Sequence, residues 1–162
     1  MPPRLHPHLD WGKELLEGLL PHRGPALRVD RLLAWDATKP ALLASVTVSP
    51  ADPLLAGHFP GGPIWPGVAT IEALAQAAGL LWALHAAGPP KARSAGAQGG
   101  PGTVFLTATH IKLTAPVRPN DTVMLTAWNL RSVGALARVD VEATVAETVV
   151  ATGRLTLAAE LT

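Results

Sequence analysis

The second half of the chain alternates apolar and polar positions with the period of two that is typical of β-strands. The clearest case is residues 137–145, where Ala and Val alternate with Arg, Asp, Glu and Thr. Residues 155–157 alternate in the same way, and Glu147-Thr148 between these segments is a plausible hairpin tip. The other strand-like segments are residues 104–113 and 122–130. The pattern therefore predicts about four strands that follow one another closely.

The first half of the chain predicts two helices and two strands. Apolar residues recur at helical spacing over residues 10–20, with Asp10 as the candidate N-cap. Segments rich in Leu and Val at 26–36 and 41–48 are typical of strands. Residues 67–87 predict a long helix that follows a proline and ends before a Gly-Pro pair. Because this helix is apolar nearly all round, we expect it to be buried.

These elements predict one α+β domain. Strands so close in sequence favour an antiparallel sheet, and a buried helix needs a sheet to cover it. The economical arrangement is an antiparallel sheet curled around the long helix. A chain of 162 residues fits a single domain over residues 1–162. Within it we expect a flexible tail over residues 1–9 and a mobile loop over the Gly-, Pro- and Ala-rich residues 88–102.

Composition narrows the class of protein. The 13 basic and 12 acidic residues give a net charge of +1, which argues against a nucleic-acid-binding protein. The chain has no Cys, which excludes disulfides, thiolate metal sites and Cys nucleophiles. The first 20 residues carry charges throughout, so they lack the apolar region of a secretion signal. The longest uncharged stretch is residues 73–90, and its apolar part is shorter than the about 20 residues that a membrane helix needs. We therefore expect a cytoplasmic protein that uses neither membrane nor nucleic acid.

The only acid in the long helix is Glu72, little more than one turn from the helix start. It is either solvated at an exposed helix end or partly buried. Burial of an unpaired carboxylate is unfavourable, so a buried Glu72 would have a raised pKa or a polar partner. Gln76 lies four residues further on the same helix face and could form a hydrogen bond with it.

A histidine precedes this helix in a stiff loop. Pro60, Pro63 and Pro66 recur at three-residue spacing after His58 and restrict the backbone. A histidine and a carboxyl group with a raised pKa near one helix start are suited to paired base and acid catalysis. The free N–H groups of the helix start favour developing negative charge, and Gly67 would let a substrate approach them. Such a charge develops on the enolate that forms when a proton leaves the carbon next to a thioester carbonyl.

These residues closely resemble the signature of the FabZ-type 3-hydroxyacyl-[acyl-carrier-protein] dehydratases, a branch of the FabA/FabZ hot-dog family. The signature reads H-F-P-G-x-P-x-x-P-G-V followed by E-A-x-A-Q, and residues 58–76 match it in register. Residues 20–31, with Leu-Pro-His-Arg and Val-Asp-Arg, are also similar to the family, as are residues 105–121, with Ala-Pro-Val and Pro-Asn-Asp. The resemblance covers about residues 14–160.

The resemblance implies a hot-dog fold, in which an antiparallel sheet wraps around a long central helix. It implies a homodimer with shared active sites, or a higher oligomer such as a trimer of dimers. The implied reaction is the dehydration of 3-hydroxyacyl thioesters to trans-2-enoyl thioesters, in fatty-acid or polyketide-type biosynthesis. The substrate would be carried on the phosphopantetheine arm of acyl carrier protein, and no metal or redox cofactor would be needed.

The resemblance also implies roles for single residues. His58 of one subunit would remove the α-proton, and Glu72 of the other would protonate the departing hydroxyl or orient the leaving water. The Gly67 N–H would hold the thioester oxygen, Gln76 would position Glu72, and Phe59 would support the site. The candidate substrate-tunnel residues are Trp65, Val68 and Phe105. Members of the family can hold a cis peptide bond between His58 and Phe59, which we expect here as well.

Two other functions are compatible with the sequence. A hot-dog thioesterase would use a carboxylate and water to cleave the same bond, and a non-catalytic acyl-binding subunit of a synthase would only hold the chain. The intact His58 and Glu72 argue against the second. Gly24 and Ala26 stand where the family commonly has aromatic residues, which leaves acyl-chain length open. The candidate basic residues for docking an acidic carrier protein are Lys91, Arg93, Lys112, Arg118 and Arg138.

Overall fold

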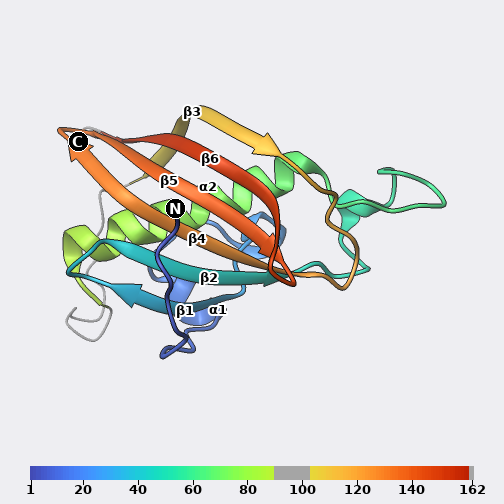
Figure 1. Ribbon diagram of the computed structural model, residues 1–162, viewed down its shortest axis with the longest axis horizontal. Coiled ribbons are helices and arrows are strands. Elements are labelled where there is room, and N and C mark those ends of the chain that lie inside the picture. Colours follow the sequence, from blue (N-terminus) through green and yellow to red (C-terminus); the bar gives the residue numbers. More distant parts are fainter. Residues whose placement is uncertain (90–102, 161–162) are drawn as a thin grey trace.

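A six-stranded antiparallel sheet wraps around one long helix in the computed structural model, which describes residues 1–89 and 103–160 (Figure 1). The spatial order of the strands is β1-β2-β4-β5-β6-β3. The strands are β1 (Arg31–Asp36), β2 (Ala41–Thr47), β3 (Val104–Leu113), β4 (Thr122–Val133), β5 (Leu136–Val145) and β6 (Thr148–Ala159). The helices are α1 (Lys13–Glu17) and α2 (Gly67–Ala87), with short 3-10 turns η1 (Gly24–Ala26) and η2 (Pro53–Leu55). The predicted arrangement of sheet and helix is confirmed.

The α2 helix fills the concave side of the sheet. Of its 21 residues, 13 are buried, and small side chains such as Ala73 and Ala77 let the strands approach closely. The sheet contributes fully buried residues such as Leu125 and Leu155 to the same core. Burying one such side chain stabilises the fold by about 1.5–3 kcal/mol. The helix is long and apolar enough to span a membrane, but its apolar surface is mostly covered by the strands.

Both ends of α2 are set by the residues that predicted them. Pro66 is the N-cap in an extended conformation, so the chain turns into the helix at Gly67. Gly88 takes a positive φ of 73° at the other end, where its N–H donates to the Leu84 carbonyl at 2.8 Å. This is the role that glycine fills at helix ends. The predicted boundaries, 67–87, are therefore confirmed.

The elements before β2 differ from the prediction. The α1 helix begins after Gly12 and not at Asp10, which instead pairs with Arg31. The first strand begins at Arg31 and not at residue 26. Residues 24–26 form the turn η1. The Ala26 carbonyl and the Arg28 N–H form hydrogen bonds with the side chain of Gln76 on α2.

The tip of the β5–β6 hairpin lies one residue earlier than predicted. Ala146 and Glu147 both take positive φ values, 45° and 68°, as the central residues of a tight two-residue hairpin require. The strand on each side is one to several residues longer than its alternating pattern indicates. Tertiary pairing therefore extends the strands beyond the segments in which periodicity is clear.

The two edges of the sheet differ in how they are covered. Along β1, the N–H groups of His8 and Leu9 both donate to the Leu33 carbonyl at 2.9 Å, so the expected flexible tail 1–9 ends against this strand. At the other edge, β3 pairs with β6 alone in the described chain and exposes most of its side chains. Residues 90–102 of the expected mobile loop lie outside the described residues.

Candidate active site

The loop between β2 and α2 fixes the orientation of His58. A cis peptide bond joins His58 to Phe59, as expected, and the two rings stack with centroids 4.2 Å apart. The Ile64 N–H donates to the His58 carbonyl at 2.8 Å, and His58 Nδ1 donates to the Ile64 carbonyl at 2.9 Å. Because a carbonyl oxygen can only accept, Nδ1 carries the proton and Nε2 keeps a lone pair. The loop therefore presents Nε2 as a base.

His58 and the start of α2 line one hollow of about 540 Å³, open solvent included. The side chain of Leu113 covers Gly67 there, and a Cβ at position 67 would lie 2.3 Å from Leu113 Cδ1. The sequence predicts that a substrate enters this gap, but in the structure Leu113 occupies it. Leu113 itself is 49% exposed, so the residue that covers this face of Gly67 lies at the surface of the hollow.

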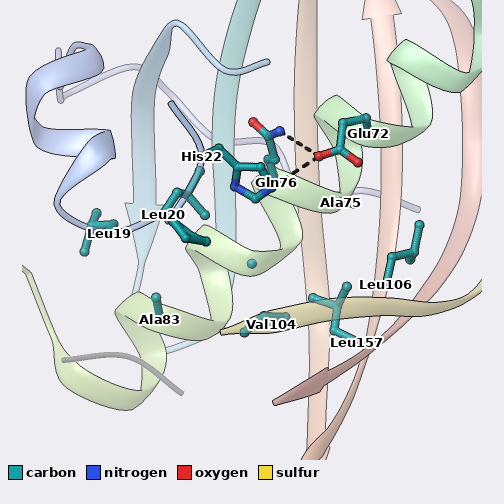
Figure 2. A pocket seen from close by; sticks show the side chains of 12 residues that line it. Leu19, Leu20, His22, Glu72, Ala75, Gln76, Ala83, Val104, Leu106 and Leu157 are labelled. Carbon is teal, nitrogen blue, oxygen red and sulfur yellow. Dashed lines mark hydrogen bonds and ion pairs between the residues drawn. The ribbon is translucent and has the colours of Figure 1, made fainter. Parts of the chain in front are cut away.

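Glu72 lines a second hollow of about 570 Å³, open solvent included (Figure 2). Gln76 Nε2 donates to Glu72 Oε1 at 2.8 Å, which confirms the predicted contact. His22 Nε2 lies 3.3 Å from the same oxygen. Among the described residues no hydrogen bond reaches Oε2, and the side chain is 42% exposed. Glu72 is therefore held through one oxygen and can meet a ligand with the other.

The expectation of a raised pKa for Glu72 is wrong for this chain. Its pKa is lowered, chiefly by the hydrogen bond from His22. Partial burial would raise the pKa, but the Gln76 hydrogen bond and the positive charge of Arg28 add to the lowering. The carboxyl group is therefore ionised at neutral pH, the form that accepts a proton from water.

Gln76 is 2% exposed, and its amide has partners at both ends. Its Nε2 donates to the Ala26 carbonyl at 2.7 Å as well as to Glu72. Its Oε1 accepts the Arg28 N–H at 2.7 Å. Gln76 therefore fastens the segment around η1 to α2 and restricts Glu72, as the sequence predicts.

A partly buried ion pair lies behind the site and was not predicted. Arg28 and Asp52 pair at 2.5 Å, with side chains only 16% and 8% exposed, and Trp65 Nε1 donates to Asp52 at 3.2 Å. Burial would raise the pKa of Asp52, but hydrogen bonds from Leu54, Trp65 and Arg28 outweigh it and lower the pKa. Arg28 and Asp52 are 24 residues apart, and no local pattern connects them.

The remaining candidates are dispersed. Trp65 is 2% exposed and borders the His58 hollow. Val68 and Phe105 are 72% and 52% exposed and line neither hollow. The described basic candidates Lys112, Arg118 and Arg138 are all exposed, whereas Lys91 and Arg93 lie outside the described residues.

One chain does not bring the proposed acid and base together. His58 lines the hollow at the start of α2, and Glu72 lines the other, with no hydrogen bond between them. Over residues 1–89 and 103–160, no cluster of three acidic or histidine side chains could hold a metal ion.

The fold and the placement of these side chains define a hot-dog protein. The dehydratase heterocomplex ApeI:P from Xenorhabdus doucetiae has the same fold, with a TM-score of 0.68 and 18% identity over 90% of this chain and 91% of that chain. A family model described as a FabA-like domain matches residues 20–154. The chain belongs to the FabA-like family.

The relatives agree with the FabZ-type resemblance. The chain is 39% identical over 116 residues to the 3-hydroxyacyl-[acyl-carrier-protein] dehydratase FabZ of Chlamydia trachomatis, covering 72% of this chain and 71% of that protein. It is 38% identical over 133 residues to the FabZ of Protochlamydia amoebophila, covering 82% of this chain and 79% of that protein. The recognition of a FabZ-type chain is thereby confirmed.

Proposed function

We propose that this protein removes water from 3-hydroxyacyl thioesters carried on acyl carrier protein, giving trans-2-enoyl thioesters in fatty-acid biosynthesis. It is a hydro-lyase, as its FabZ relatives are by name. The observation that carries the proposal is the His58–Gln76 signature in this family context. The free Nε2 of His58 and the unpaired Oε2 of Glu72 within the described chain are the groups that such chemistry needs.

The proposed active site is shared between the subunits of a homodimer. The exposed edge strand β3 has unpaired backbone groups and the exposed apolar side chains of Phe105, Leu106 and Leu113. Leu113, at one end of β3, lines the His58 hollow, and Leu106, near the other end, lines the Glu72 hollow. Antiparallel pairing of two β3 strands about a twofold axis would bring the His58 hollow of each subunit to the Glu72 hollow of its partner.

The proposed mechanism is general base and general acid catalysis. His58 Nε2 takes the α-proton, and the N–H of Gly67 stabilises the thioester oxygen as negative charge develops. Glu72 of the other subunit gives a proton to the departing β-hydroxyl, or orients the leaving water, while Gln76 holds it in place. Protonation of the departing hydroxyl needs a proton on Glu72 before dehydration, and the lowered pKa of Glu72 makes this the minor form at neutral pH. The carboxylate, the major form, is the one that orients the leaving water and, in the reverse hydration, accepts a proton while His58 gives one up. The side chains of His58 and Glu72 supply base and acid and the backbone of Gly67 supplies the oxyanion donor, so the proposal includes no metal or redox cofactor.

The proposed partner is an acyl carrier protein that presents the substrate on its phosphopantetheine arm. Lys112 and Arg118 each adjoin a residue that lines the His58 hollow, Leu113 and Val117, so they flank the proposed entrance. Arg138 on β5 is another candidate, as are Lys91 and Arg93, which lie outside the described residues. We propose a cytoplasmic location, with a trimer of dimers as one assembly that the dimer allows.

A turnover assay tests the function. Purified protein is incubated with a chain-length series of 3-hydroxyacyl thioesters, and enoyl absorbance and free thiol are followed together. We expect enoyl absorbance without thiol release. Thiol release would identify a thioesterase, and binding without either product would identify a non-catalytic acyl-binding subunit.

A further inference from the structure

We propose that His22 is a positioning residue of this site, which holds Glu72 as a carboxylate through Oε1 and leaves Oε2 to exchange the proton with substrate. The inference rests on the proposed role of Glu72. His22 lies between α1 and η1, outside the signature that contains His58 and Glu72.

Both donors to Glu72 reach the same oxygen. His22 Nε2 approaches Oε1 at 3.3 Å, and Gln76 Nε2 donates to it at 2.8 Å; Figure 2 shows both contacts converging on this one oxygen. Across the described residues, no donor approaches Oε2. A carboxylate bound in this way is fixed in direction, and its two oxygens have different environments. Oε1 is occupied, so Oε2 is the oxygen that can accept a proton from water.

The hydrogen-bonding state of His22 favours donation to Glu72. Its Nδ1 is buried and has no hydrogen-bond partner in the described part of the chain. A buried N–H without an acceptor is more unfavourable than a buried lone pair, above all when the ring is charged. Nε2 is therefore the ring nitrogen that carries the proton facing Glu72.

The loop that carries His22 is held rigidly. The side chain of Arg23 donates from Nη1 to the carbonyls of Leu20 and His22, both at 2.7 Å. Leu20 itself is 7% exposed and packs in the core. These contacts fix the backbone from which the imidazole of His22 reaches Glu72.

Few charges other than His22 act on Glu72. The residues that line its hollow are apolar apart from His22, Gln76 and Glu72 itself. Arg28, in the segment after η1, adds a weaker positive influence, and Gln76 on α2 is neutral. Since the hydrogen bond from His22 is the main cause of the lowered pKa of Glu72, its removal should raise that pKa.

The effect can be measured in the hydration of an enoyl thioester, where Glu72 must be ionised to accept the proton of water. Activity is then lost on the acid side as the pH falls through the pKa of Glu72. We expect the acid limb of kcat/KM to move to higher pH in His22→Leu. In His22→Gln, which keeps an N–H donor, we expect the limb to lie closer to that of the wild type.

His85→Gln is the matched control, because His85 is an exposed histidine on the same helix α2. It should leave the pH profile unchanged. Suppose that Glu72→Gln abolishes hydration but the acid limb of His22→Leu lies where it does in the wild type. This result would overturn the inference about His22 and leave the proposed function intact. If Glu72→Gln itself retained full activity, the proposed function of Glu72 would fail instead.

A second readout does not depend on activity. The chain has six Glu residues, so carboxyl-labelled glutamate gives few resonances in NMR, and the Glu72 signal is the one missing from Glu72→Gln. We expect this signal to titrate at higher pH in both folded His22 variants than in the wild type, more so for Leu than for Gln. An unchanged titration in His22→Gln and His22→Leu would show that His22 does not set the ionisation of Glu72.

Discussion

At the scale of single residues, sequence reasoning identified contacts along one helix but not those that arrive from other segments. The four-residue spacing of Glu72 and Gln76 correctly predicted their hydrogen bond. The direction of the pKa shift of Glu72 was wrong because His22 comes from a loop 50 residues earlier. His22 was visible in the family-like segment, but spacing alone could not show which side chain it faces.

The proposed acid and base should each be needed for turnover. His58→Ala removes the base, and Glu72→Gln removes the acid while keeping its size. Each change should lower the hydration rate of an enoyl thioester by about 10²–10⁴-fold, as general acid–base groups do. Because both groups act on one transition state, the double variant should be little worse than the poorer single one. Loss of enoyl absorbance measures the rate.

Both variants should fold, since neither side chain is part of the buried core. Circular dichroism and thermal unfolding provide this control. A folded His58→Ala variant that kept more than about a tenth of the wild-type kcat would contradict the assignment of the base.

The partly buried pair of Arg28 and Asp52 should matter for stability. Asp52→Asn leaves the guanidinium with no ionic partner in the described chain, which typically destabilises a fold by about 3 kcal/mol. The pKa of Asp52 is lowered in the folded state, so its contribution is full above the ordinary aspartate pKa. It is lost as the pH falls through the lower folded value, and the difference between wild type and variant should shrink in acid.

Urea unfolding at neutral and at acid pH measures this difference. Asp10→Asn is the control, because its pair with Arg31 is more than half exposed on both sides and should contribute little. Equal free energies of unfolding for the two variants at neutral pH would contradict the prediction that the Arg28–Asp52 pair stabilises the fold more than the exposed pair does.

At the scale of elements, the sequence pattern predicted helix and strand limits correctly where local backbone geometry sets them, and incorrectly where tertiary packing does. The limits of α2 were predicted because Pro66 and Gly88 act locally, by backbone geometry. The start of β1 was predicted too early because the Leu and Val residues before Arg31 are apolar as part of the core and not as part of a strand. Leu27 and Val29 are buried in the core without belonging to a strand. Apolar content shows burial, but strand pairing needs partners that local sequence does not specify.

The β3–β6 pairing should depend on Gly153. A Cβ at this position would lie 2.0 Å from the His110 carbonyl oxygen, which belongs to the backbone of β3 and cannot move away without breaking the ladder. Gly153→Ala should therefore destabilise the fold by about 1–3 kcal/mol, as overpacking does. Denaturant unfolding gives the value.

Gly57→Ala is the matched control, since nothing lies within 4 Å of its built Cβ. It should be neutral or slightly stabilising. Equal stabilities of the two alanine variants would show that β3 can shift to make room, and that its contact with β6 is loose.

At the scale of the whole molecule, the strand order follows from the sheet's closure around α2 and not from local pattern. Sequence reasoning predicted an antiparallel sheet and its six strands, but β3 lies beside β6 only in three dimensions. That placement leaves β3 as an exposed edge that carries the exposed side chains of Phe105 and Leu106. His58 and Glu72 line different hollows of one chain, which is why the proposed active site is shared between two subunits.

Mixing two inactive variants tests whether the site is shared. In a dimer of one His58→Ala chain and one Glu72→Gln chain, one site would lack both groups and the other would have both. If the two variants are unfolded together and refolded in equal amounts, half of the dimers are mixed, so activity should return to about a quarter of the wild-type value. A His58→Ala chain refolded with the double variant is the control, because every site then lacks the base. A site built within one chain would give no recovery in either mixture, whereas recovery only in the first places His58 and Glu72 on different subunits.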